Sequence, residues 1–193
     1  MSNSIYLVLD MENDLIHADG PNGKAPYGEQ ARARRIVENT RRALDKARAA
    51  GLRVGFVRVG FSPDYREAPA NSPIFSAARK NGIFKLGTWG TQVHPDLGQQ
   101  PTDFDIVKHR VSPFYSTHLE VILRAQDVRR IYCSGISTNA VVQALVREGH
   151  DRDYEMVVLE DCCCGLSAEE HEGAIKSLQR FCRITTSTDV TFE

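Results

Sequence analysis

Segments typical of strands alternate with segments typical of helices along this chain, and this order restricts the fold more than any other feature. Runs rich in aliphatic and β-branched residues predict six strands, at 4–10, 53–59, 104–108, 129–134, 155–160 and 182–187. Strands separated by helices pair in parallel, with the helices covering both faces of the sheet. We therefore expect an α/β fold, a three-layer αβα sandwich of the doubly wound, Rossmann-like type.

Helical periodicity fills the intervals between these strands. Between the first two, apolar or small residues recur every three or four positions and predict one long amphipathic helix that ends at Gly51. The members of this stripe are Ala33, Ile36, Val37, Thr40, Ala43, Leu44 and Ala47. Thr117 with Glu120, and Ser167 with Glu170, have the spacing of capping boxes and predict two further helix starts.

The composition fits a single domain that spans residues 1–193. With 41% hydrophobic residues, a chain of 193 residues can bury an ample core, and it shows no repeat or linker. The formal net charge is -1 and no basic run is present, which disfavours nucleic acid and membranes as partners and favours a small molecule. The first residues lack the pattern of a signal peptide, so we expect a cytoplasmic protein.

Cysteine and histidine spacing gives no sign of a metal or cofactor site. The five cysteines include three consecutive ones, Cys162 to Cys164, and none form a CxxC pair, so we expect reduced thiols. No two histidines have the HxxxH or HxH spacing of metal ligands. We therefore expect neither a metal nor another cofactor.

Three chemically informative segments follow predicted strands. Asp10 closes the first strand, Lys108 closes the third, and a tight turn at Gly135 leads from the fourth strand into a helix. Parallel strands bring their carboxyl ends to one edge of the sheet, where such folds bind ligands. A thiol at Val141, near the start of that helix, would be activated by the helix dipole, but valine cannot ionise. The sequence thus predicts an acid/base pair, Asp10 and Lys108, without a nucleophile.

Residues near this edge are candidates for the pocket wall. The long irregular stretch 60–101 is rich in proline and glycine, and loops of this length usually build sites. Exposed aromatic residues in loops often line either a pocket or an oligomer contact, and Phe61, Tyr65, Trp89 and Phe114 are candidates for this. Glu12 would add a carboxylate near Asp10. The candidate pocket residues are Glu12, Phe61, Trp89, Phe114 and Asn139.

Two arginines near strand ends leave two interpretations open. Arg58 and Arg110 could bind a substrate carboxylate in a bidentate manner, or each could form an ordinary ion pair at the surface.

Together, three segments resemble motifs of the isochorismatase-like hydrolases, also called the cysteine hydrolase superfamily. Residues 10–15 resemble Asp-x-Gln-Asn-Asp-Phe, residues 107–110 carry the superfamily's lysine, and residues 135–142 match Gly-x-x-Thr-x-x-Cys-Val. The resemblance implies that Asp10 is the acid/base, that Lys108 is its partner and that Val141 occupies the cysteine position. Most amide-cleaving members need that cysteine, whereas isochorismatases proper lack it and cleave a vinyl ether.

The same resemblance implies further structure. It predicts the strand order 3-2-1-4-5-6 and a non-proline cis peptide in the turn formed by Gly135, Ile136, Ser137 and Thr138. In cysteine members this turn aims backbone N–H groups at the oxyanion. It also implies a homo-oligomer, from a dimer to an octamer.

Three functions remain open on the sequence alone. The leading hypothesis is a hydrolase of a small molecule that uses Asp10 and Lys108 without cysteine, acting on a vinyl ether or a related bond. The second is a non-catalytic binding protein that keeps the pocket. The third is an amide or carbamoyl hydrolase with a displaced thiol from Cys162 to Cys164.

Overall fold

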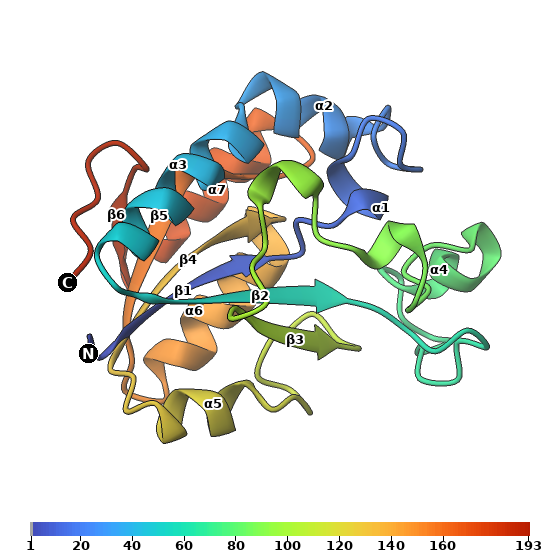
Figure 1. Cartoon of the computed structure of the whole chain (residues 1–193). Helices are drawn as coiled ribbons and strands as arrows, with labels where there is room; N and C mark the ends of the chain where they lie inside the picture. Colours follow the sequence, from blue (N-terminus) through green and yellow to red (C-terminus); the bar gives the residue numbers. More distant parts are fainter. Residues whose placement is uncertain (1) are drawn as a thin grey trace.

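A six-stranded parallel sheet lies between layers of helices in the computed structural model, which describes residues 2–193 (Figure 1). Its order is β3-β2-β1-β4-β5-β6, which confirms the predicted fold class. The strands are β1 (Ser4–Leu9), β2 (Arg53–Val59), β3 (Phe104–Lys108), β4 (Arg130–Ile136), β5 (Glu155–Cys164) and β6 (Arg183–Thr185).

Helices cover both faces of this sheet, α3 on one side and α5 and α6 on the other (Figure 1). Among residues 2–193, no helix is long and apolar enough to cross a membrane. The α-helices are α1 (Asn13–Ile16), α2 (Pro26–Ala33), α3 (Ile36–Ala49), α4 (Ser76–Asn81), α5 (Leu119–Ala125), α6 (Gln143–His150) and α7 (Ala168–Leu178). Shorter turns are η1 (Trp89–Thr91), η2 (Pro95–Leu97) and η3 (Thr138–Val142).

The central strand β1 is buried on both faces, and its side chains alternate between two cores. Tyr6 and Val8 join the cluster that packs against α3, whereas Ile5, Leu7 and Leu9 join the cluster under α5 and α6. Burying each of these side chains contributes roughly 1.5–3 kcal/mol. The strand is therefore firmly held, and the residue that follows it, at the middle of the carboxyl edge, has a fixed position.

The predicted long helix after β1 is in fact two helices, because the chain breaks at Arg34 and Arg35. Arg35 has a left-handed backbone, with φ 54°. The Arg34 side chain donates hydrogen bonds to the carbonyl of Cys163 at 2.9 Å and to the carboxylate of Glu160 at 2.8 Å. This anchoring to β5 is a long-range contact that helical periodicity does not reveal. The predicted end at Gly51 is confirmed by its φ of 73°.

One of the two predicted capping boxes forms its hydrogen bond. The Ser167 hydroxyl accepts a hydrogen bond from the backbone N–H of Glu170 and caps α7. The prediction for Thr117 is wrong, because its hydroxyl accepts from the N–H of Leu119 and donates to the carbonyl of Pro113. Helix α5 begins at Leu119, one residue later than a cap at Thr117 would place its start.

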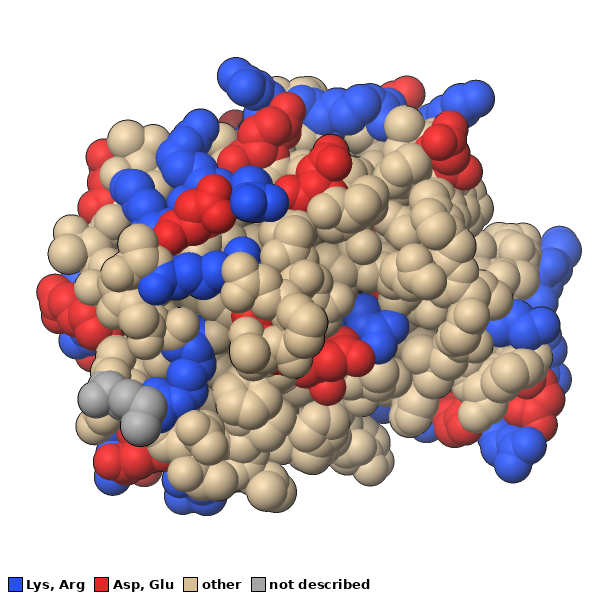
Figure 2. Space-filling model, viewed as in Figure 1, with Lys and Arg blue, Asp and Glu red and all other residues tan. Residues whose placement is uncertain are grey.

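Charged side chains of both signs are interspersed over the face shown in Figure 2. A dense basic patch, which nucleic acid or an anionic membrane would require, is not seen on this face. This distribution agrees with a small-molecule partner.

Candidate active site

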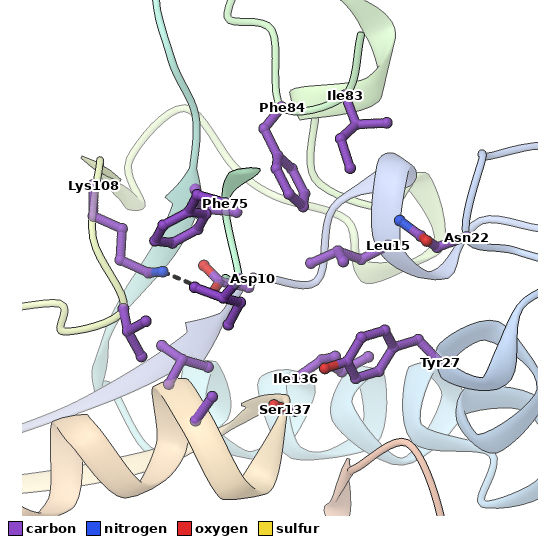
Figure 3. Close-up of a pocket in the computed structure, with 15 residues that line it drawn as sticks. Asp10, Leu15, Asn22, Tyr27, Phe75, Ile83, Phe84, Lys108, Ile136 and Ser137 are labelled. Atoms are coloured by element: carbon purple, nitrogen blue, oxygen red, sulfur yellow. Dashed lines mark ion pairs between the residues drawn. The ribbon is translucent and has the colours of Figure 1, made fainter. Parts of the chain in front are cut away.

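An ion pair between Asp10 and Lys108 lies at the carboxyl edge of the sheet (Figure 3). Asp10 follows β1 in a left-handed conformation, φ 54°, and its N–H donates to the carbonyl of Val57 at 2.7 Å. Its Oδ2 lies 2.8 Å from Nζ of Lys108, the last residue of β3. The ammonium also donates to the carbonyl of Arg110 at 3.1 Å. Both side chains are almost completely buried.

The two oxygens of Asp10 have different surroundings. Oδ2 is paired with Lys108, whereas Oδ1 is buried and has no hydrogen-bond partner within residues 2–193. Burial raises the pKa of Asp10, and the neighbouring ammonium opposes that shift without cancelling it. Oδ1 is therefore the atom that can carry a proton to a bound molecule or take one from it.

The turn after β4 lies directly against the backbone that carries Asp10. Gly135 has φ 151°, and a Cβ at this position would lie 2.2 Å from the carbonyl oxygen of Leu9, so only glycine allows this approach. The peptide between Ile136 and Ser137 is cis, in the turn where the resemblance predicts one. Ile136 and Ser137 line the pocket. The Thr138 hydroxyl instead forms a hydrogen bond with Nδ1 of His171 at 2.8 Å.

Val141 lines the same pocket as Asp10 and Lys108. It belongs to the π-helical turn η3, which joins the end of β4 to α6, and its side chain is buried. The structure thus brings Asp10, Lys108 and the predicted nucleophile position together. The site therefore contains the carboxylate of Asp10 and the ammonium of Lys108, and it has the side chain of Val141 at the position predicted for a thiol.

The rest of the pocket wall is mainly apolar and encloses a cavity of about 170 Å³. Much of it comes from the stretch 60–101, in agreement with the expectation that this stretch builds the site. The apolar residues of the wall include Leu15, Ile74, Phe75, Ile83, Phe84 and Val111. Sequence reasoning missed all six, although Phe75 and Phe84 belong to the aromatic residues of that stretch and could have been considered with Phe61.

Two predicted pocket aromatics lie outside the wall. Phe61 is fully buried and packs edge-on against Phe75, with 5.5 Å between ring centroids, so it supports the wall from behind. Trp89 is 44% exposed and contacts the ring of His17. An aromatic residue in a loop can therefore be a core or a surface residue, and its sequence context does not distinguish these cases from a pocket residue.

Phe114 and Asn139 were also predicted to line the pocket, and they lie elsewhere. Phe114 packs against Tyr154, and the guanidinium of Arg152 lies 4.7 Å from its ring centroid. Asn139 is exposed, and its amide donates to the carboxylate of Glu170. Neither lines the cavity.

The two arginines that could have bound a substrate carboxylate are already engaged. Arg58 forms two hydrogen bonds with the carboxylate of Asp105, at 2.7 and 2.6 Å. Arg110 donates to the backbone carbonyls of Glu67 and His109. The ion-pair interpretation therefore holds for Arg58, whereas Arg110 braces the backbone.

The consecutive cysteines do not supply a displaced thiol. Cys162, Cys163 and Cys164 are fully buried in β5, and none lines the pocket. Burial raises the pKa of all three thiols, that of Cys164 to about 12. Within the described part of the chain, no group of three His, Cys, Asp or Glu side chains could hold a metal ion.

Glu12 lies near Asp10 and Lys108 but does not line the pocket. It is completely buried, and neither of its carboxylate oxygens has a hydrogen-bond partner within residues 2–193. Burial raises the pKa of Glu12 well above its ordinary value, and the carboxylate of Asp10 adds to this, while Lys108 and Arg58 oppose it. The folded environment therefore favours the protonated, neutral acid more than water does for an exposed glutamate.

Replacing Glu12 by glutamine should increase stability at about pH 8 by about 1–3 kcal/mol and have less effect at about pH 5. Because the folded-state pKa is raised, the wild type loses stability as pH rises from the ordinary glutamate range through that pKa. Glutamine has the same shape and no charge to bury. Urea unfolding at both pH values measures the effect, and Glu172→Gln, an exposed substitution on α7, is the matched control. Equal stability changes at the two pH values would contradict a protonated Glu12.

Residues 4–189 match the Isochorismatase domain. The chain belongs to the isochorismatase family, within the isochorismatase-like hydrolases. It is 32% identical over 192 residues to the ureidoacrylate amidohydrolase RutB of Methylorubrum extorquens, covering 92% of this chain and 77% of that protein. It is 34% identical over 172 residues to RutB of Yersinia enterocolitica, covering 83% and 74%.

A solved structure shares the fold of the whole chain. The crystal structure of an isochorismatase family protein from Desulfovibrio vulgaris superposes with a TM-score of 0.85 at 22% sequence identity, covering 97% of this chain and 96% of that one. The family resemblance derived from three short motifs is thus confirmed over nearly the full length.

Proposed function

We propose that this hydrolase cleaves a small molecule by acid/base catalysis through Asp10, without a covalent thiol step. The observation that carries the proposal is the buried ion pair of Asp10 and Lys108 in a pocket whose thiol position is Val141. The raised pKa of Asp10 suits a general acid, because it keeps the carboxyl protonated at a higher pH than an exposed aspartate.

The chemistry that fits this site best is hydrolysis of a vinyl ether. Asp10 Oδ1 gives its proton to the terminal vinyl carbon, and the ether oxygen stabilises the cation that forms on the neighbouring carbon. Water adds to that cation and returns a proton to Asp10, and the resulting hemiacetal separates into an alcohol and a carbonyl compound. The Lys108 ammonium, 2.8 Å away, stabilises the carboxylate between these steps.

The magnitude of the available catalysis separates this chemistry from amide cleavage. Acid/base catalysis alone supplies about 10²- to 10⁴-fold, which is useful for an acid-labile enol ether and small for an amide. RutB relatives are amidohydrolases by name. In this chain Val141 has no nucleophilic atom, and the thiols of β5 are buried away from the cavity. The arrangement therefore favours the vinyl ether over the amide.

The test compares two substrates before and after treatment with iodoacetamide. We expect phenyl vinyl ether to release phenol faster than in buffer, with the rate unchanged by alkylation, and ureidoacrylate to remain intact. Ureidoacrylate cleavage that alkylation abolishes would establish a thiol amidase instead. Binding of phenyl vinyl ether without cleavage would contradict the proposal and support a non-catalytic binding protein.

A Val141→Cys variant should acquire a reactive thiol without becoming an efficient amidase. The position lies at the start of the helical segment η3–α6 and in the same pocket as Lys108, which favours the thiolate. We expect iodoacetamide to label it faster in the folded than in the denatured protein, measured by mass spectrometry against the wild type. Ureidoacrylate turnover should stay below about 1 s⁻¹, because oxyanion donors must match the carbonyl closely. Turnover above that rate would mean that the site is an amidase lacking only its thiol.

A further inference from the structure

The charge balance of the pocket wall restricts the molecules that it can bind. Of the 15 residues that line the cavity, Asp10 and Lys108 carry the ionisable carboxylate and ammonium, and they pair with each other at 2.8 Å. Since Lys108 also donates to the carbonyl of Arg110, its ammonium is already engaged. The wall therefore offers no unpaired cation, and its anion faces the ligand.

The two arginines that the sequence suggested for carboxylate binding are engaged elsewhere. Arg58 and Arg110 are held by Asp105 and by backbone carbonyls, and neither lines the cavity. A carboxylate entering this pocket would lose its hydration without gaining an ion pair, and it would meet the carboxylate of Asp10.

The apolar walls and the size of the cavity indicate what fits instead. Phe75 and Phe84 extend into it from one side, and Leu15 and Ile136 also line it (Figure 3). An engineered apolar cavity of about 150 Å³ holds benzene, and this one has about 170 Å³. One ring, or an aliphatic group of similar size, would fill it.

A few polar atoms restrict where the ligand can be polar. Asp10 Oδ1 is buried without a partner, so a ligand group must reach it for the site to be satisfied. On the opposite side, the hydroxyl of Tyr27 and Ser137 lie close to each other (Figure 3). Asn22 adds an amide to the lining, and the rest of the wall is mainly apolar.

We propose that this pocket takes a neutral small molecule with an apolar body of about one ring and one polar group placed against Asp10. The proposal rests on the proposed function only in taking this pocket as the active site. A neutral ligand would distinguish this chain from the RutB relatives, because the substrate in their name, ureidoacrylate, is a carboxylate.

Isothermal titration with benzamide and with benzoate tests this ligand class, since the two differ little in shape and differ in charge. At about pH 8, benzamide should bind at least tenfold more tightly than benzoate, because Lys108 is engaged by Asp10 and the wall has no free cation for the carboxylate. Toluene, which lacks the polar group, should bind more weakly than benzamide.

Two matched variants test whether the preference for benzamide over benzoate arises in the pocket. Ile74 lines the cavity and is 53% exposed, whereas Val121 on α5 is 69% exposed and lies outside the lining. Ile74→Arg should strengthen benzoate binding, because the arginine supplies the missing cation. The ratio of benzamide affinity to benzoate affinity should therefore fall at least threefold. Val121→Arg should leave the preference unchanged.

The outcomes separate this inference from the proposed function. Benzoate binding as tightly as benzamide, or no binding of either, would overturn the ligand class whatever the enzyme cleaves. An equal effect of Ile74→Arg and Val121→Arg would also overturn it, since the preference would then reflect overall charge. Tight benzamide binding together with intact phenyl vinyl ether would uphold the ligand class and reject the proposed reaction.

Discussion

Replacing Asp10 by asparagine should lower kcat for phenyl vinyl ether by at least about 10²-fold while the protein keeps its fold. The amide has nearly the shape of the carboxyl group and can still accept a hydrogen bond from Lys108, 2.8 Å away in the wild type. It has no proton that can be transferred to carbon. KM should change little, because the apolar wall that holds the substrate body stays intact. Steady-state kinetics measures kcat and KM, and circular dichroism checks that the variant is folded.

The control for this variant is Asp45→Asn, which removes an exposed carboxylate that pairs with Arg41 on α3. Its kcat should equal that of the wild type. In the wild type, kcat should fall as pH rises through the pKa of Asp10, because the acid form exists below that pKa, and burial moves the fall to higher pH. An Asp10→Asn variant with kcat within about threefold of the wild type would reject Asp10 as the acid.

The sheet and the centre of the site were accessible from sequence because both follow from short-range patterns. Aliphatic runs identified the strands, and strand ends in a parallel sheet must meet at one edge, which placed Asp10 beside Lys108. The Gly135 turn could also be located, since its backbone requires glycine where β4 touches the carbonyl of Leu9. These features depend on residues close in sequence or on a fixed topology.

The pocket wall could not be derived in the same way. Phe61 and Phe84 both belong to the stretch 60–101, yet Phe61 is a core residue while Phe84 lines the cavity. Long-range contacts hold both residues: the N–H of Phe61 donates to the carbonyl of Phe84, and the N–H of Phe84 donates to the carboxylate of Asp14, 70 residues earlier. No periodicity marks such a contact.

The irregular part of β5 also depends on long-range contacts. Its register shifts between the pairing of Cys133 with Val158 and that of Gly135 with Cys163. Arg34 holds this irregular part by hydrogen bonds to Glu160 and Cys163. Whether the cysteines of β5 could reach the pocket was open from the sequence, and it is this local geometry that buries them.

Replacing Lys108 by methionine should destabilise the fold by about 3–5 kcal/mol and also abolish most of the activity. Methionine retains much of the apolar stem but leaves the carboxylate of Asp10 buried with no opposing charge. The pKa of Asp10 then rises further, since the ammonium is the group that opposes burial. A raised folded-state pKa means that stability is lost as pH rises, so the loss should be larger at about pH 8 than at about pH 5. Urea unfolding at the two pH values measures it.

The double variant Asp10→Asn with Lys108→Met distinguishes a buried charge from lost packing. Removing both charges should recover most of the stability lost in Lys108→Met, because an uncompensated charge is what makes the single variant unstable. The exposed control Lys176→Met on α7 should change stability by less than about 0.5 kcal/mol. If the double variant were as unstable as Lys108→Met, packing of the lysine stem would account for the loss. The pair would then not be an electrostatic unit, and Lys108 could not be the group that tunes the acid.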